Sequence, residues 1–399
     1  MPQRNASARR GLYRGAGRTI YLDNAATSFP KPQVVTEAMQ DAVLRIGASP
    51  GRGGHRLALE AGRTVFGCRA AVARLLMAGQ PDRVTFTKNA TEAINAALFG
   101  VLRPGDHVVT TDIEHNALWR PLRLLADRGV ELTVVAAEED GTVDPDRFCR
   151  AIREGTRLVA LTHASNVLGA LVDVRPIAQA AHRAGALVLV DAAQTLGEQP
   201  VDVEAMEIDL LAAPGHKGLL GPQGTGVLYV GPRVQAIEPL ITGGTGSRSE
   251  EAEQPDVLPD RLESGTLNLP GIAGLGAALR YLDDTGEDLR SRTARRTAEL
   301  VDGLSQIAGV RILGPRENAR RAALVAFTLG EADSEDVAAA LDRQGIACRG
   351  GLHCAPQAHR KAGTIATGAV RLSPGPFTSE QDVQEALAAV AAVTREVAP

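Results

Sequence analysis

The chain has 399 residues, more than a single small core needs, so we expect two domains or a large domain with a smaller lobe. Its composition, 44% hydrophobic and 23% charged, is that of an ordinary globular protein, and a formal net charge of −4 gives no global reason to expect a nucleic-acid partner. No apolar run approaches the length of about 18 residues that a membrane span needs, so we expect no membrane partner.

The first segment, residues 1–19, is rich in arginine. Residues 1–18 contain five arginines, no acidic residue and no apolar stretch, which is not the pattern of a secretory signal. A transit peptide can have this composition and stays open as an alternative. We expect a flexible N-terminal tail.

The chain has four cysteines and no CxxC pair, and at this length it does not need disulfides in order to fold. We therefore expect a reduced, cytoplasmic protein with free thiols. The four thiols belong to Cys68, Cys149, Cys348 and Cys354.

Lysine is rare in this chain. Only four of its 43 basic residues are lysine, and the rest are arginine. Because the chain uses arginine wherever a generic cation is enough, a lysine indicates a position where arginine cannot replace it. The four are Lys31, Lys88, Lys217 and Lys361.

From about residue 84 to residue 230, short apolar runs alternate with helix-like segments. The runs are rich in Val and Leu and lack polar alternation, as expected for strands buried on both faces. The alternation predicts an α/β fold with an open, mainly parallel seven-stranded sheet. The predicted strands are 84–87, 107–110, 132–137, 158–162, 186–190, 208–213 and 226–230, and the predicted helices are 91–100, 117–128, 145–153 and 175–184.

Residues 231–268 interrupt this pattern. They include a stretch rich in Gly, Ser, Pro and acidic residues, which predicts a loop, and its length suggests a function. The elements after it predict a smaller α+β lobe, so we divide the chain into a large domain, 20–265, and a small C-terminal domain, 266–399. The later helices are predicted at 271–283, 286–308, 334–344 and 378–397, and the later strands at 309–313, 323–329 and 369–373.

Polar residues follow five of the predicted strands. Ligands of open α/β sheets bind beyond the carboxyl ends of the strands, so these residues could converge on one place. They lie at 88–92, 111–116, 163–166, 191–194 and 214–218.

This set suits pyridoxal-5′-phosphate (PLP), whose aldehyde needs a lysine and whose pyridine nitrogen needs a carboxylate. Lys217 lies in a turn whose glycines would let a cofactor approach closely. Asp191 ends the most apolar strand, where an unpaired carboxylate would be costly and a pyridinium would offset that cost.

The remaining parts of a PLP site also have candidates. His115 could stack on the ring, with Gln194 and Asn166 donating to the phenolic oxygen. A helix start and a histidine could hold the phosphate. Each residue alone has a plainer interpretation, since a strand-end Asp is often a helix cap and a single His is often structural, so the ordered set carries the argument. The phosphate candidates are Ala90, Thr91 and His216.

From residue 20 to Ser373 the chain resembles the cysteine desulfurase family, a group of class V aminotransferase-like, fold-type I PLP-dependent enzymes. The motif around Cys354 is similar to the selenocysteine-lyase-like branch of that family. The motifs that carry the resemblance are Tyr-Leu-Asp-Asn-Ala-Ala-Thr (21–27), Asn-Ala-Thr-Glu-Ala-Ile-Asn (89–95), Glu-His-Asn (114–116), Ser-Asn-Val-Leu-Gly (165–169), Val-Asp-Ala-Ala-Gln (190–194), Gly-His-Lys (215–217), Gly-Leu-His-Cys-Ala-Pro (351–356) and Val-Arg-Leu-Ser (370–373).

The resemblance implies a role for each matching residue. The large domain would bind PLP, with Lys217 as the Schiff-base lysine, Asp191 as the pyridinium partner and His115 on the ring. The substrate, L-cysteine or L-selenocysteine, would contact Arg371, Asn166 and Asn24. In a homodimer, Thr266 would reach the phosphate in the other subunit.

The resemblance also implies that Cys354 takes the substrate sulfur as a persulfide, releasing L-alanine, and passes it to a protein acceptor. Glycines precede Cys354 and a proline follows it, and Arg349 and His353 could favour its thiolate. Cys68 and Cys149 lie in helix-like apolar surroundings, and Cys348, the closest rival, ends an apparent strand.

Two positions depart from the family pattern. Pro214 and Ala90 stand where relatives usually have phosphate-binding hydroxyl groups, so the phosphate would depend more on backbone N–H groups, Thr91, His216 and Thr266. Selenocysteine lyase, another class V aminotransferase or lyase reaction, and a non-enzymatic protein with a relict pocket remain as alternatives. We expect no metal.

Overall fold

The computed structural model describes residues 18–51 and 53–397. The predicted tail lies outside these residues, apart from its last two positions. No helix in the described part is long and apolar enough to cross a membrane.

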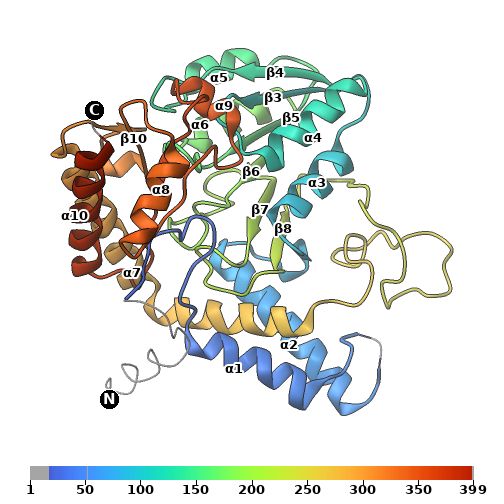
Figure 1. Ribbon diagram of the computed structural model, residues 1–399. Coiled ribbons are helices and arrows are strands. Elements are labelled where there is room, and N and C mark those ends of the chain that lie inside the picture. Colours follow the sequence, from blue (N-terminus) through green and yellow to red (C-terminus); the bar gives the residue numbers. More distant parts are fainter. Residues whose placement is uncertain (1–17, 52, 398–399) are drawn as a thin grey trace.

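The large lobe is built on a seven-stranded sheet with the order β2-β8-β7-β6-β5-β3-β4 (Figure 1). All neighbouring strands are parallel except β8, which is antiparallel to β2 and β7. The predicted α/β fold with a mainly parallel seven-stranded sheet is therefore confirmed. The strands are β2 (Val84–Thr87), β3 (His107–Thr111), β4 (Glu131–Val135), β5 (Thr156–Thr162), β6 (Leu187–Asp191), β7 (Leu210–Pro214) and β8 (Gly226–Val230).

Both faces of this sheet are buried except at the edge strand β4, where Glu131 and Val134 are exposed, which explains why the other strands are apolar without alternation. Val109 and Val159 belong to the core on one face, whereas Val108 and Leu158 belong to the core on the other face, where α3 and α4 pack. The helices of the sheet region are α3 (Ala90–Val101), α4 (Asn116–Asp127), α5 (Pro145–Ala151) and α6 (Val174–Arg183), within two residues of their predicted limits.

The bounds of the N-terminal helices were not predicted from the sequence. These are α1 (Gln33–Asp41), a π-helical turn (Ala42–Ile46), α2 (Arg56–Leu75) and a 3₁₀ turn (Pro81–Arg83). In α2, buried Ala58, Ala61, Val65 and Cys68 recur at helical spacing, so a signal for this helix was present in the sequence.

Helix α7 (Leu269–Ser305) corrects the prediction of two helices at 271–283 and 286–308. The predicted break falls at Asp284 and Thr285, directly before Gly286, but the helix continues through all three. A glycine costs about 1 kcal/mol in a helix interior, and here Leu282 and Leu289 on the flanking turns are buried in one apolar cluster. Tertiary packing therefore outweighs the local preference.

The small lobe contains a three-stranded antiparallel sheet of order β12-β10-β9. Strand β1 (Ile20–Tyr21) pairs in parallel with β11 (Ile346–Ala347), and Ile20 and Leu22 join the core of this lobe. The division of the chain at residue 265 stays a prediction. The other elements are β9 (Val310–Leu313), a 3₁₀ turn (Asn318–Arg320), β10 (Val325–Leu329), α8 (Ser334–Arg343), α9 (Pro356–Lys361), β12 (Val370–Leu372) and α10 (Glu380–Val397).

Residues 231–268 contain no helix or strand, as predicted. A buried ion pair fixes the end of this loop to the large lobe. Arg69 Nη1 and Nη2 donate to Glu263 Oε1 and Oε2, both at 2.8 Å, and Phe86 N donates to Glu263 Oε1 at 2.6 Å. The loop is therefore anchored beside Thr266.

Candidate active site

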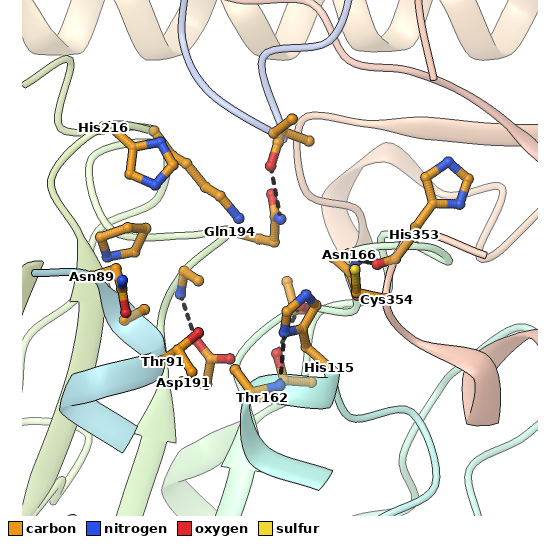
Figure 2. A pocket seen from close by; sticks show the side chains of 18 of the residues that line it. Asn89, Thr91, His115, Thr162, Asn166, Asp191, Gln194, His216, His353 and Cys354 are labelled. Carbon is orange, nitrogen blue, oxygen red and sulfur yellow. Dashed lines mark hydrogen bonds between the residues drawn. The ribbon is translucent and has the colours of Figure 1, made fainter. Parts of the chain in front are cut away.

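Ten of the residues singled out from the sequence line one cavity of about 240 Å³. A single water needs only about 10–15 Å³ of such space, so the cavity has room for a ligand of many atoms. Figure 2 shows Thr91 and His216 on one side of it and His353 and Cys354 on the other. The ten are Ala90, Thr91, His115, Asn166, Asp191, Gln194, His216, Lys217, Cys354 and Arg371.

Asp191 is the last residue of β6, at the centre of the sheet, and is only 3% exposed. Its Oδ1 accepts a hydrogen bond from Ala193 N at 2.9 Å. Burial raises the pKa of this carboxyl, and the Ala193 N–H and the charge of Lys217 act against that rise. A cationic ligand beside Asp191 would stabilise the ionised carboxylate.

Lys217 lies in the connection between β7 and β8. A Cβ on Gly215 would lie 2.2 Å from Thr225 Oγ1, and one on Gly218 would lie 2.4 Å from Leu196 O. The glycines therefore let the turn pack closely against the protein itself, whereas the sequence suggested that they admit a cofactor.

A second lysine holds this turn in place. Lys31 Nζ donates hydrogen bonds to His216 O at 2.8 Å and to Ser28 Oγ at 2.6 Å, and Ser28 N also donates to His216 O at 3.0 Å. Burial lowers the pKa of Lys31 to about 8. Lys31 had no predicted role, although the rarity of lysine in this chain was the signal that could have identified it.

His115 is the N-cap of α4, and its Nδ1 accepts a hydrogen bond from Ala117 N at 3.0 Å. Burial, together with the positive charges of Lys217, Arg349 and Arg371, lowers the pKa of His115 to about 4. The imidazole is therefore neutral at neutral pH, with its proton on Nε2.

The residue before it, Glu114, is completely buried. Its Oε1 accepts a hydrogen bond from Thr111 Oγ1, and its Oε2 has no partner among the described residues. Burial raises the pKa of Glu114 to about 8, and Asp191 contributes in the same direction. The sequence showed Glu114 only as part of a motif, because nothing local indicates that this side chain points into the core.

The N-terminus of α3 forms one end of the cavity. Asn89 caps it, with Oδ1 accepting from Glu92 N at 2.9 Å, while the N–H groups of Ala90 and Thr91 have no acceptor within the helix. These N–H groups and the helix dipole favour an anion. His216 Nδ1 is buried without a hydrogen-bond partner in the described part of the chain.

Asn166 and Gln194 reach the cavity from the loops after β5 and β6. Asn166 Nδ2 donates to His353 O at 2.7 Å, and Asn166 Oδ1 is buried without a partner among residues 18–51 and 53–397. Gln194 Nε2 donates to Ala25 O at 3.2 Å. The unpaired Asn166 oxygen is free to accept a hydrogen bond from a ligand.

Arg371 lies on β12 and is 2% exposed. Its Nη1 donates to Asn166 O at 3.0 Å and its Nη2 to Asp23 Oδ1 at 2.9 Å, whereas Nε has no partner among the described residues. Arg349 also lines the cavity, and its backbone pairs with that of Arg371. The small lobe therefore contributes two guanidinium groups.

Cys354 is the only exposed cysteine of the four. Its backbone has a φ of +57°, and its carbonyl accepts a hydrogen bond from Asn116 N at 2.8 Å. Burial raises the pKa of Cys68 and of Cys348 to about 12 and raises that of Cys149. The thiol at the cavity is thus the most accessible one.

Two predicted residues lie outside this cavity. Asn24 Nδ2 donates to Ser373 O at 3.0 Å and Oδ1 accepts from Phe29 N at 3.1 Å, so the side chain links the segment after β1 to the residue that follows β12. Thr266 lines a second hollow, together with Leu240 and Ile241.

Comparisons with known proteins agree with this arrangement. The Aminotransferase class-V family matches residues 20–386. The chain is 41% identical to a probable cysteine desulfurase of Methanothermobacter thermautotrophicus, over 92% of each chain. It is 35% identical to a cysteine desulfurase of Pectobacterium atrosepticum, over 94% of this chain and 93% of the relative.

Solved structures lead to the same group. The apo structure of a cysteine desulfurase from Thermococcus onnurineus NA1 matches with a TM-score of 0.89 and 33% identity, over 95% of each chain. The cysteine desulfurase CsdA (S-sulfonic acid) from Escherichia coli matches with a TM-score of 0.84 and 30% identity, again over 95% of each chain. The chain therefore belongs to the Aminotransferase class-V family and, within it, to the cysteine desulfurases.

Proposed function

We propose that this protein converts L-cysteine to L-alanine with PLP as its cofactor and transfers the sulfur to Cys354. The observation that carries the proposal is the position of Cys354, an exposed thiol on the same cavity as Lys217 and Asp191. A transaminase or a simple lyase needs the lysine and the carboxylate but has no use for a thiol at this place.

The cavity fits PLP in two respects. Asp191 is a buried carboxyl whose ionised form needs a cation, which the pyridinium would provide. The start of α3 and His216 Nδ1 offer unpaired groups for the phosphate. Pro214 and Ala90 contribute no hydroxyl there, so the phosphate would rely on backbone N–H groups, Thr91 and, in a dimer, Thr266 of the second copy.

Bound PLP would supply an electron sink that takes up the negative charge developing at the substrate carbons. Burial, with Arg371 in the same direction, lowers the pKa of Lys217 to about 8, so a sizeable fraction of its amine is unprotonated near neutral pH. This amine is suited to bond the cofactor aldehyde and then to move the substrate Cα proton. Neutral His115 would cover the ring and donate from Nε2.

The sulfur step balances without a further oxidant. The Cys354 thiolate attacks the substrate sulfur, the S–S bond forms, and the Cβ–S bond breaks with its electron pair directed to carbon. That carbon takes up a proton and becomes the methyl group of alanine, while the enzyme sulfur is oxidised to a persulfide. Arg371 would bind the substrate carboxylate, since Nε and part of its donor set are unpaired.

We also propose that the protein is a cytoplasmic homodimer that passes its sulfur to an acceptor protein. Leu240 and Ile241 are 42% and 50% exposed beside Thr266, and a second copy would cover them. The exposure of Cys354 supports transfer to another protein's thiol. The four free cysteines suit the reducing cytoplasm.

The test is to incubate the PLP-loaded protein with L-cysteine and, in parallel, with L-selenocysteine, and to quantify alanine and enzyme-bound sulfur or selenium. The proposal predicts alanine and bound sulfur from L-cysteine in a 1:1 ratio during the first turnover. Alanine from L-selenocysteine alone would show a selenocysteine lyase instead. A protein that purifies colourless and binds no PLP would be a non-enzymatic relative.

A further inference from the structure

A hydrogen-bond chain of buried side chains begins at His353, the residue directly before Cys354. His353 and His359 are 4% and 0% exposed. His353 Nε2 lies 3.2 Å from Arg349 O, His353 Nδ1 lies 3.4 Å from His359 Nε2, and His359 Nδ1 lies 2.8 Å from Thr364 Oγ1. The hydrogen-bond chain therefore connects the start of the Cys354 loop with the segment that follows α9.

The two rings meet edge to edge. Their planes differ by 11° and their centroids are 5.6 Å apart. This separation is close to the sum of the 3.4 Å distance between His353 Nδ1 and His359 Nε2 and the distance from each of these nitrogens to the centre of its own ring. The two nitrogens therefore face each other along the line between the ring centres. The contact is therefore a long N–H···N hydrogen bond.

The donor and acceptor in each hydrogen bond of this hydrogen-bond chain follow from the group at its Arg349 end. Arg349 O can only accept, so His353 Nε2 carries a proton and the Nδ1 of a neutral His353 is an acceptor. His359 Nε2 must then donate, which leaves His359 Nδ1 to accept from the Thr364 hydroxyl. Burial lowers the pKa of His359 to about 4, and burial and the charge of Arg371 lower that of His353, so both rings are neutral at neutral pH.

The loop that this chain supports is strained. His353 has a φ of +50° and Cys354 a φ of +57°, in the left-handed region of backbone conformation that residues other than glycine rarely occupy. Such a conformation persists only where the surroundings fix it. Asn166 Nδ2 and Asn116 N bind the carbonyl groups of His353 and Cys354, and the His353 ring closes back on Arg349 O.

We propose that His359 and Thr364 are positioning residues that act through His353 to keep the Cys354 thiol aimed at the substrate. This inference rests on the proposed function of Cys354 as sulfur acceptor. It assigns a role to two side chains that lie outside the cavity and do not reach the substrate themselves.

The test uses two matched pairs of variants in the PLP-loaded enzyme. His359→Phe keeps a ring but removes the donor to His353, whereas His359→Gln keeps an N–H at nearly the same position. Thr364→Val removes the hydroxyl, whereas Thr364→Ser keeps it. Thr394→Val, which deletes a hydroxyl that binds Val390 O in α10, is the control for a remote Thr→Val change.

Three quantities are measured for each variant: PLP absorbance, the spectral titration with L-cysteine, and the rate of alanine formation. The alkylation rate of Cys354 by iodoacetamide is a fourth, which does not depend on desulfurase activity. His359→Phe should slow alanine formation about tenfold, the effect of one lost hydrogen bond, and change the alkylation rate. PLP and L-cysteine binding should stay as in the wild type, and His359→Gln and Thr364→Ser should restore most of the rate.

Unchanged alanine formation and unchanged alkylation in both His359→Phe and Thr364→Val would overturn the proposal. So would a loss of PLP binding in step with the loss of activity, because that result shows a general structural role. If His359→Phe does not fold, the Thr364 pair decides the question alone. If the wild type produces no alanine, the proposed function fails, while the alkylation rates still report whether this chain positions Cys354.

Discussion

The amine of Lys217 is a weaker base than an ordinary lysine amine, because burial and the nearby Arg371 disfavour its charged form. Only the neutral amine can bond to the PLP aldehyde. We therefore predict that the rate of PLP incorporation into apoenzyme rises about tenfold per pH unit below the pKa of about 8 and levels off above it. Absorbance after mixing apoenzyme with PLP at several pH values measures this rate.

Borohydride reduction and peptide mapping complete this test. The pyridoxyl group should be found on Lys217, and Lys88→Met, which changes an exposed lysine, should leave the profile unaltered. A pyridoxyl group on Lys31, Lys88 or Lys361 would refute the assignment.

Arg371 presents its guanidinium to the cavity while Asp23 and Asn166 O hold it in place. Arg371→Ala should retain PLP but weaken L-cysteine binding roughly 10- to 100-fold, the effect of losing charged hydrogen bonds. Arg371→Lys should not restore binding fully, because an ammonium lacks the planar fork. A spectral titration with L-cysteine measures the affinity.

Arg349→Ala is the comparison for this prediction, since Arg349 lines the same cavity. An L-cysteine affinity that is unchanged in Arg371→Ala and lost in Arg349→Ala would transfer the carboxylate site to Arg349.

The residue patterns predicted which side chains converge on the cavity. They indicated much less about the hydrogen bonds and ion pairs that hold each side chain in place. Polar residues after strands had to meet at one edge of a parallel sheet, so Asp191, His115 and Lys217 could be placed together from the sequence. The bonds that occupy Asn24 and the clamp formed by Lys31 depend on segments far apart in the chain. No local pattern encodes such contacts.

Among the elements, the loop 231–268 depends most clearly on one buried contact. Arg69 and Glu263 are 5% and 8% exposed, and their ion pair joins α2 to the end of the loop. Arg69→Met should lower the free energy of unfolding by about 3–5 kcal/mol, because it leaves an unpaired buried carboxylate. Denaturant unfolding measures this change.

An exposed ion pair provides the control. Arg74 and Asp283 lie 3.1 Å apart on the surface, so Arg74→Met should cost less than about 1 kcal/mol. Equal losses in the two variants would contradict the structural importance given to the Arg69 pair.

Most strand and helix positions between residues 84 and 230 followed from hydrophobicity, because every strand except the edge strand β4 is largely buried on both faces. The reversed direction of β8 did not follow, since an apolar run has the same composition in either direction. Helix α7 was predicted as two helices separated at Asp284 and Thr285, directly before Gly286. Its packing against α1 and α2, which is not local, keeps the helix continuous.

At the scale of the whole molecule, the exposed apolar residues beside Thr266 are expected to bind a second copy of the chain. Leu240→Glu combined with Ile241→Glu should convert the dimer to a monomer and abolish alanine formation, since each site would lose the partner's Thr266. Val134→Glu, at another exposed apolar position, should leave the dimer intact. Sedimentation equilibrium measures the oligomeric state, and a fully active wild-type monomer would refute the prediction.

The central claim is that Cys354 receives sulfur from L-cysteine. The most direct measurement compares Cys354→Ser with Cys348→Ser, after reaction with L-cysteine, by alanine yield and by mapping the persulfide. We predict that Cys348→Ser forms both products, whereas Cys354→Ser still changes the PLP spectrum with L-cysteine but yields little alanine and no persulfide. Alanine and persulfide at the wild-type rate in Cys354→Ser would contradict it.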